Sequence, residues 1–170
     1  MVSTLLALSR LESKQIAFEP QTIPLKEQVE KIWQNFADKA HDRELSFENQ
    51  IDDSLCCVSD TDHLGMILSN ILDNAAEYCN NQGQIRVKAD RRGDTVMLTL
   101  SNTGCRLSPA DIEQVFDFFW RADTARTDTD AHCGIGLAVV RKVATLLGVK
   151  VKAEIEQDSV FFITLELLTA

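Results

Sequence analysis

Two side-chain amides stand out in the segment from Ser69 to Tyr78, which reads SNILDNAAEY. Residues four apart fall on the same side of a helix, so Asn70, Asn74 and Tyr78 form one stripe. Asparagine is a poor helix former because its amide competes for backbone hydrogen bonds. We therefore expect a group outside this helix to hold the amides. A wide apolar face lies beside the stripe and consists of Leu64, Ile67, Leu68, Ile71, Leu72 and Ala75.

Two other segments could join these amides in binding one ligand. The sequence SNTGC places Asn102 directly after an apolar strand pattern, and GIGL, residues 134–137, opens a helix. Glycines at a helix start allow close backbone approach, and the free N–H groups there favour an anion. Amide oxygens suit a hard cation such as Mg²⁺, while Asn102 could pair with the edge of adenine and Tyr78 could lie against the base. Each segment alone is more often structural, since a buried asparagine is usually a hydrogen-bonded core amide.

Composition limits the other possibilities. The chain has 170 residues, of which 45% are hydrophobic and 25% charged, as expected for one globular domain. A net charge of −9 and a pI near 4.8 argue against a nucleic-acid-binding surface. No apolar run resembles a membrane span or a signal peptide, so we expect a cytoplasmic domain, whether or not the parent protein is anchored in the inner membrane. The five cysteines lack C-x-x-C spacing, which favours reduced thiols over a zinc site.

Pro20 and Pro24 divide the chain into two parts. Residues 4–15 carry leucines at helical spacing, and the prolines prevent this helix from continuing. We interpret residues 1–19 as the tail of a longer helix with a linker; a frayed terminus is the alternative. Residues 20–170 then form the main domain.

The apolar periodicity predicts the elements of this domain. Helices are expected at 25–40, 60–81 and 135–147, and strands at 45–51, 55–58, 84–89, 96–100 and, as a hairpin, within 149–167. Asp60 should cap the second helix, and Ser108, Pro109 and Asp111 announce a short one. The stretch of about 103–133 is long for a connection and is interpreted as a lid. The sum is an α+β fold, a two-layer α/β sandwich with three core helices on one face of a mixed, mostly antiparallel sheet of about five strands.

The order of these motifs resembles one known family, the catalytic ATP-binding domain of sensor histidine kinases. DNA gyrase B and the heat-shock chaperone ATPases are its wider relatives, and the shared architecture is the Bergerat-type ATP-binding fold. DHLGMILSNILDNAAEY is similar to the family's N box, SNTGCRLSP to its first glycine box, VFDFFWRAD to its F box and HCGIGLAVVRKV to its second glycine box. The resemblance covers roughly residues 20–168. LLALSRLES resembles the end of the dimerisation helix that precedes such domains, which argues against a serine kinase of the anti-sigma-factor type.

The resemblance implies a site for ATP and Mg²⁺. Asn70 and Asn74 would hold Mg²⁺ and orient the phosphates, and Arg121 or Arg126 would reach the terminal phosphate. Asn70, Arg121 and Arg126 would thereby assist catalysis. Phe116 and Phe119 would anchor the lid. The residues implied in nucleotide binding are Asn70, Asn74, Tyr78, Asn102, Gly104, Gly134, Gly136 and Leu137.

The implied activity is that of a protein-histidine kinase, in which the γ-phosphoryl group of ATP passes to a histidine on a dimerisation domain absent from this chain. His41, His63 and His132 all lack the helical context of such an acceptor. The implied partners are the protein's own dimerisation and histidine-phosphotransfer helices and a response regulator, with a homodimeric parent protein and no nucleic acid.

Four departures from the family pattern keep an alternative open: a degenerate nucleotide-binding or protein-interaction module without kinase activity. Asn102 stands in place of the usual aspartate, Arg106 in place of a glycine, and His132 in place of a further glycine. Glu77 occupies a position that is basic in many members. A carboxylate beside triphosphate is repulsive unless it faces solvent or a cation such as Arg121.

Overall fold

The computed structural model describes residues 18–122, 134–156 and 159–170. None of the helices in these ranges is long and apolar enough to cross a membrane. The elements are β1 (Gln21–Pro24), α2 (Leu25–Trp33), the 3₁₀ helix η1 (Gln34–Phe36), α3 (Ala37–Asp42), β2 (Ser46–Asn49), β3 (Cys56–Ser59), α4 (Thr61–Tyr78), β4 (Gln84–Arg92), β5 (Thr95–Asn102), α5 (Pro109–Ile112), α6 (Gly136–Leu147), β6 (Lys150–Glu156) and β7 (Val160–Thr169).

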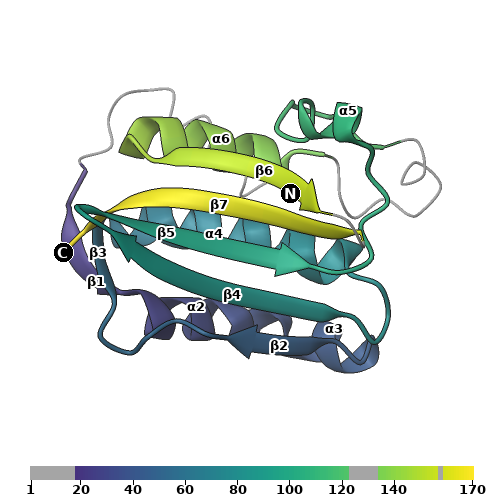
Figure 1. Ribbon diagram of the computed structural model, residues 1–170, viewed down its shortest axis with the longest axis horizontal. Helices are drawn as coiled ribbons and strands as arrows, with labels where there is room; N and C mark the ends of the chain where they lie inside the picture. Colours follow the sequence, from purple (N-terminus) through teal and green to yellow (C-terminus); the bar gives the residue numbers. More distant parts are fainter. Residues whose placement is uncertain (1–17, 123–133, 157–158) are drawn as a thin grey trace.

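The strands form one mixed sheet with the helices on one of its faces (Figure 1). The order is β1-β3-β7-β5-β4-β2, and β6 also pairs with β7. Only β2 and β4 run parallel among these described pairs, while the others are antiparallel. Helices α2, α4 and α6 are the three core helices, so the predicted α+β sandwich is confirmed.

Along the two central strands, β5 and β7, fully buried side chains alternate with more exposed ones. One face of β5 and β7 is apolar and buried, as period-two alternation requires. Its buried register pairs are Val96 with Leu167, Leu98 with Leu165, and Leu100 with Ile163. On the other face, the hydroxyls of Thr99 and Thr164 lie 3.2 Å apart. Helix α4 packs its apolar face on the buried side and contacts α6 and α2 at its flanks.

Asp60 caps the N-terminus of α4, as predicted. Its carboxylate accepts hydrogen bonds from the backbone N–H groups of Asp62 at 3.1 Å and His63 at 3.0 Å. It also accepts from the N–H of Glu19 at 3.1 Å, and its Oδ1 lies 2.7 Å from Nδ1 of His63. The cap therefore ties the entering chain to the start of α4.

The side chain of Arg43 binds carbonyl groups at the C-terminal end of α4. The sequence analysis did not predict this contact. Its guanidinium donates to the carbonyl oxygens of Ala76 and Glu77, both at 2.6 Å, and of Cys79 at 2.5 Å. It also donates to Oδ1 of Asn81 at 3.1 Å. These carbonyls have no partner within the helix, and a cation there is favoured by the helix dipole.

Several predicted boundaries were wrong in detail. The described sheet has seven strands rather than about five, and β1, which pairs with β3 and ends at Pro24, was not predicted. A proline can end an edge strand because it lacks only a donor there. Residues 25–40 are not one helix: η1 interrupts them and brings Phe36 beside Trp33, with ring centroids 6.0 Å apart. Helix α4 ends at Tyr78 rather than 81.

Replacing Arg43 with alanine should lower the free energy of unfolding by about 2 kcal/mol, because partly buried carbonyls at the end of α4 lose charge-assisted hydrogen bonds. Urea unfolding monitored by circular dichroism measures the change. Arg91 of the exposed β4 hairpin end is the matched control, and Arg91→Ala should stay within about 0.5 kcal/mol of the unaltered protein. Equal losses in both variants would contradict the proposed role of Arg43.

Asp60 should make stability depend on acid pH. Burial acts to raise the pKa of its carboxyl, but hydrogen bonds from His63 and Glu19 outweigh it and lower this pKa. A carboxyl whose pKa is lower in the folded state stabilises the fold at neutral pH and loses this contribution as the pH falls through its folded-state pKa. The stability gap between the unaltered protein and Asp60→Asn should thus be largest at pH 7 and shrink between about pH 5 and pH 2. A gap that stays constant in urea titrations across this range would contradict the assignment.

Candidate functional site

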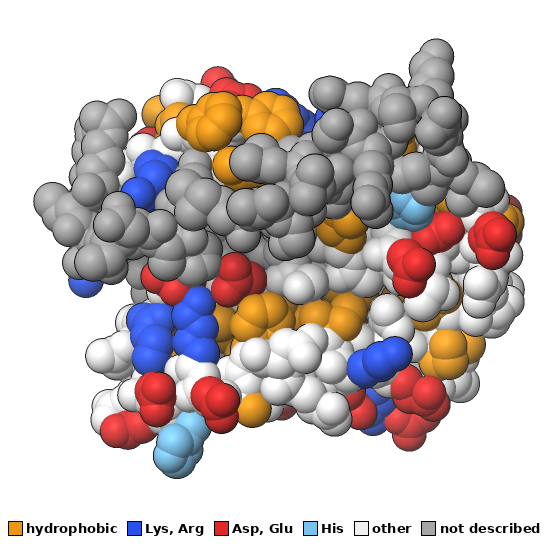
Figure 2. Space-filling view, turned by 180° about the vertical axis from the view of Figure 1, so that it is seen from behind, with side chains coloured by type: hydrophobic (Ala, Val, Ile, Leu, Met, Phe, Trp, Pro, Cys, Tyr) orange, Lys and Arg blue, Asp and Glu red, His pale blue; other side chains and the backbone are white. Residues whose placement is uncertain are grey.

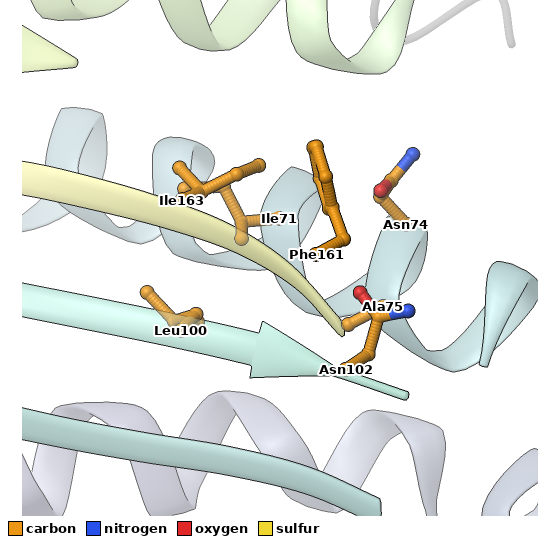
Figure 3. Close-up of a pocket in the computed structure, with 7 residues that line it drawn as sticks. All are labelled: Ile71, Asn74, Ala75, Leu100, Asn102, Phe161 and Ile163. Carbon is orange, nitrogen blue, oxygen red and sulfur yellow. The ribbon is translucent and has the colours of Figure 1, made fainter. Parts of the chain in front are cut away.

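A narrow pocket opens where three segments meet: the C-terminal half of α4, the end of β5 and the start of β7 (Figure 3). The space between its side chains is about 170 Å³, part of it open to solvent, and is too constricted to hold a water molecule. Its walls are apolar except for two amides, those of Asn74 and Asn102. The lining residues are Ile71, Asn74, Ala75, Leu100, Asn102, Phe161 and Ile163. The structure brings Asn74 and Asn102 together in one pocket, although 28 positions separate them in the numbering.

Asn102 is buried, with only 3% of its surface exposed. Its Nδ2 donates to the carbonyl oxygen of Thr103 at 3.3 Å. Figure 3 shows the Asn102 oxygen on the side facing α4, whereas Asn74 points away from the strands. With its donor end engaged by the backbone, Asn102 presents a hydrogen-bond acceptor to the pocket.

Asn70 connects α4 to the start of α6. Its Nδ2 donates to the carbonyl oxygen of Met66, one turn earlier, at 2.8 Å. This bond lies within α4, so the nitrogen is not held by a group outside the helix as expected, and Oδ1 is left facing the neighbouring helix: a Cβ added to Gly136 would lie 3.3 Å from it. Glycine at this position therefore permits close approach of α6 to the amide stripe. Leu137, the next residue, is buried in the core.

Two other glycines are required by both conformation and space. Gly104 has φ +81°, and a Cβ there would lie 2.6 Å from side-chain atoms of Asn80, just after α4. Gly134 has φ +68°, and a Cβ would lie 2.5 Å from the carbonyl oxygen of Trp120. Left-handed backbone disfavours any residue with a side chain. Both glycines therefore shape the loops around the pocket.

Tyr78 ends the amide stripe and lies near Arg121. Burial raises the pKa of the Tyr78 hydroxyl, and the charge of Arg121 acts in the opposite direction. Tyr78 is 40% exposed, so its ring forms part of the outer rim rather than of the core. The structure therefore gathers Asn70, Asn74, Tyr78 and Arg121 along one side of α4. Arg126, the other predicted arginine, lies outside the described residues.

The F-box residues behave differently from one another. Phe116 is buried, whereas Phe119 is 69% exposed and so is not held by burial. Phe119 instead holds the two ends of the loop together, because its N–H donates to the carbonyl oxygen of Gly134 at 2.9 Å. The remainder of the predicted lid, 123–133 with His132, lies outside the described residues.

Two residues beside the site were missed by the sequence reasoning. Lys39 of α3 lies 2.6 Å from Oε2 of Glu77 and 3.2 Å from Oδ1 of Asp73. Glu77 thus has a lysine among its partners. Arg43 fixes the end of α4, just beyond Tyr78. No local signal marks either contact, because each joins residues more than 30 positions apart in different helices.

Gly104 allows a sharp test of the pocket's shape, because Gly93 shares its positive φ but has no atom within 4 Å of the added Cβ. Gly93→Ala should cost about 1 kcal/mol from backbone strain alone. Gly104→Ala should cost at least about 2 kcal/mol more, since its Cβ must displace Asn80. Chemical unfolding of both variants measures the difference. Equal destabilisation would mean that the loop at Gly104 relaxes freely.

Comparisons with known proteins agree with this geometry. Residues 59–169 match the family described as histidine kinase-, DNA gyrase B-, and HSP90-like ATPase. Sensor protein SrrB of Staphylococcus aureus is 25% identical over 167 residues, which cover 97% of this chain and 29% of that protein. The chain therefore spans less than a third of the length of this curated relative.

Solved structures share the fold at low sequence identity. Full-length ShkA in complex with AMPPNP aligns with a TM-score of 0.84 and 19% identity, covering 99% of this chain and 35% of that one. The Acinetobacter baumannii histidine kinase AdeS aligns with a TM-score of 0.80 and 22% identity, covering 98% and 76%. Histidine kinase ThkA in complex with the response regulator TrrA gives 0.78 and 21%, covering 99% and 47%. The segments that resemble the N box and the first glycine box lie on α4 and at the end of β5, two of the three elements that line the pocket, and the chain belongs to the histidine kinase-, DNA gyrase B-, and HSP90-like ATPase family, with the fold of histidine kinase catalytic domains.

Proposed function

We propose that this chain is the catalytic domain of a two-component sensor histidine kinase, which binds ATP with Mg²⁺ and transfers the γ-phosphoryl group to a histidine on another domain. The observation that carries the proposal is the convergence of Asn74 and Asn102 in one pocket, with Oδ1 of Asn70 facing Gly136 at the start of α6. These residues come from three of the motifs that resemble the family's boxes. Family membership supports the same conclusion.

The base would occupy the apolar pocket. Asn102 can accept a hydrogen bond from the adenine amino group, because its own N–H₂ is engaged by Thr103. The pocket is smaller than most small-molecule sites, so entry of a base must widen it. Phe161, the second residue of β7, is the register partner of Asn102 and the wall residue best placed to adjust. Tyr78 on the rim would lie against the nucleotide.

The phosphates would lie between α4 and the start of α6. The first N–H groups of α6 lack partners within the helix and favour an anion. Asn70 and Asn74 offer amide oxygens of the kind that suit Mg²⁺, which would neutralise phosphate charge when bound. Gly134 and Gly136 would let the backbone approach. Arg121 would reach the terminal phosphate, as would Arg126 of the segment outside the described residues.

Transfer requires an acceptor and in-line positioning more than covalent chemistry from this domain. His63 is hydrogen-bonded to the buried cap Asp60, and His41 lies on the short helix α3. Neither has the context of a phosphoacceptor. The acceptor would be supplied by the protein's own dimerisation helices within a homodimer, and a response regulator would receive the phosphoryl group. ThkA, a structural neighbour, was solved in complex with such a regulator.

The second candidate is a nucleotide-binding or interaction module without kinase activity. Asn102 favours it, since an amide gives a weaker bond to adenine than the charge-assisted bond of an aspartate. Two other departures from the family pattern give this alternative little support in the structure. Arg106 is exposed and does not line the pocket, and Glu77 is paired with Lys39. We therefore favour the catalytic function.

Titration calorimetry with Mg-ATP tests nucleotide binding. Asn74→Ala should weaken Mg-ATP affinity at least about tenfold, because it removes one amide oxygen at the pocket. Asn35 in the exposed 3₁₀ helix is the matched control, and Asn35→Ala should leave affinity unchanged. Absence of binding heat and of thermal stabilisation with saturating Mg-ATP and Mg-ADP would sink both candidate functions in their nucleotide-binding form.

Radiolabelled ATP tests the transfer step. The chain alone should stay unlabelled, while a separate protein made of the parent's dimerisation helices should acquire acid-labile, alkali-stable label when mixed with it. Transfer should be slow because the two domains lack a tether. Arg121→Ala should reduce the rate more than nucleotide affinity if this arginine acts in transfer. Nucleotide binding without labelled helices would favour the non-catalytic module.

A further inference from the structure

A charged cluster joins α3 to α4 next to the candidate site. Nζ of Lys39 lies 2.6 Å from Oε2 of Glu77 and 3.2 Å from Oδ1 of Asp73. All three side chains are half-buried, with 29%, 35% and 40% of their surfaces exposed for Lys39, Glu77 and Asp73. Figure 2 shows basic and acidic side chains gathered side by side over α3. Since Asp73 and Glu77 are one helical turn apart, one ammonium group can bridge both.

This cluster lies beside the amide stripe that would face the phosphates. Glu77 comes three residues after Asn74 and directly before Tyr78 on α4. The charges of Glu77, Asp73, Lys39 and Arg121 all act on the Tyr78 hydroxyl. The carboxylates of Asp73 and Glu77 are therefore close enough to act electrostatically on the site, although they lie on the flank of α4 that faces α3.

Two carboxylates so near a triphosphate would oppose its binding. Like charges repel over several ångströms at the edge of a protein, where screening by water is incomplete. The chain as a whole is already anionic, with a net charge of −9, so its overall field gives no compensation. Compensation must come from local cations. Lys39 is one of them, and it comes from a helix outside the motifs that resemble the family's boxes.

We propose that Lys39 is a positioning residue for nucleotide binding: it offsets the charge of Asp73 and Glu77 and holds both carboxylates towards α3, so that polyanionic ligands are accepted at the amide stripe. This inference rests on the proposed function and deepens it, because it names the residue that lets the site bind a polyanion despite the nearby carboxylate of Glu77. Lys39 touches no ligand in this account. Its effect is electrostatic and acts through Glu77 and Asp73.

A purely structural role is the competing explanation, since Lys39 also links two helices. Arg43 already ties the residues after α3 to the end of α4 through several backbone carbonyls. The two roles differ in their dependence on ligand charge. Loss of a structural link weakens all ligands alike, whereas loss of charge compensation weakens ligands in proportion to their negative charge.

The experiment measures binding of Mg-ATP, ADP and adenosine to the unaltered chain and to Lys39→Met, Glu77→Gln and the double variant, at low and physiological salt. Lys39→Met should weaken Mg-ATP and ADP by about fivefold at low salt and less at high salt, with adenosine unchanged. Glu77→Gln in the Lys39→Met background should restore most of the affinity, and Lys39→Arg should preserve it. Thermal melting confirms that each variant is folded.

Lys26 is the matched control. Its Nζ pairs with Asp53 at 2.6 Å and its side chain is 31% exposed, close to the 29% of Lys39, but this pair lies outside the cluster. Lys26→Met should leave all three affinities unchanged. Equal weakening of adenosine and Mg-ATP by Lys39→Met, no weakening at all, or no recovery with Glu77→Gln would each overturn the inference. Failure of the unaltered chain to bind any nucleotide would instead overturn the proposed function on which it rests.

Discussion

The structure depends on the burial of one face of α4 against the sheet. Leu64, Leu68 and Leu72 are fully buried on this face, and α2 and α6 pack at its flanks. Each residue turns the helix by about 100°, so the apolar face also sets the direction of Asn70 and Asn74 at its edge. A small rotation would bury the amides or pull leucines into solvent, and both changes are costly. The hydrophobic contact therefore holds the amide stripe towards the pocket without any contact designed for that purpose.

Both ends of α4 are secured by groups from distant parts of the chain. Asp60 satisfies N–H groups at the start and also holds the N–H of Glu19, whereas Arg43 satisfies carbonyls at the end. Since β5 ends and β7 begins beside the C-terminal half of this helix, its fixed position places Asn74 in the same pocket as Asn102. Gly136 then lets α6 come close to Asn70. The site is thus the place where ends of several elements meet around a rigid helix.

Two cationic side chains lie near the candidate site, although the domain as a whole is acidic. The chain carries a net charge of −9, yet Arg121 and Lys39 both lie near Tyr78 on the rim of the pocket. Lys39 is paired with carboxylates on the flank of α4, which leaves the amide stripe itself neutral. An uncharged stripe suits a ligand that brings its own metal ion, because Mg²⁺ offsets part of the phosphate charge. The acidic surface elsewhere is compatible with this arrangement, since screening limits its reach to about 10 Å.

Elements with a local signature in the sequence could be predicted from the sequence alone. Alternation over residues 84–100 predicted the β4–β5 hairpin, helical periodicity predicted α4 and α6, and Asp60 and Ser108 marked helix starts through capping. Of the residues singled out by the spacing of the amides and by the glycine motifs, Asn74 and Asn102 line the pocket in the structure. Other features could be found only in the folded structure. They are the pairing of β1 with β3, the interruption of residues 25–40 by η1, and the partners of Arg43 and Lys39. Each of these features depends on residues far apart in the sequence, and such contacts follow from the packing of whole elements, which leaves no periodic pattern or capping motif to read.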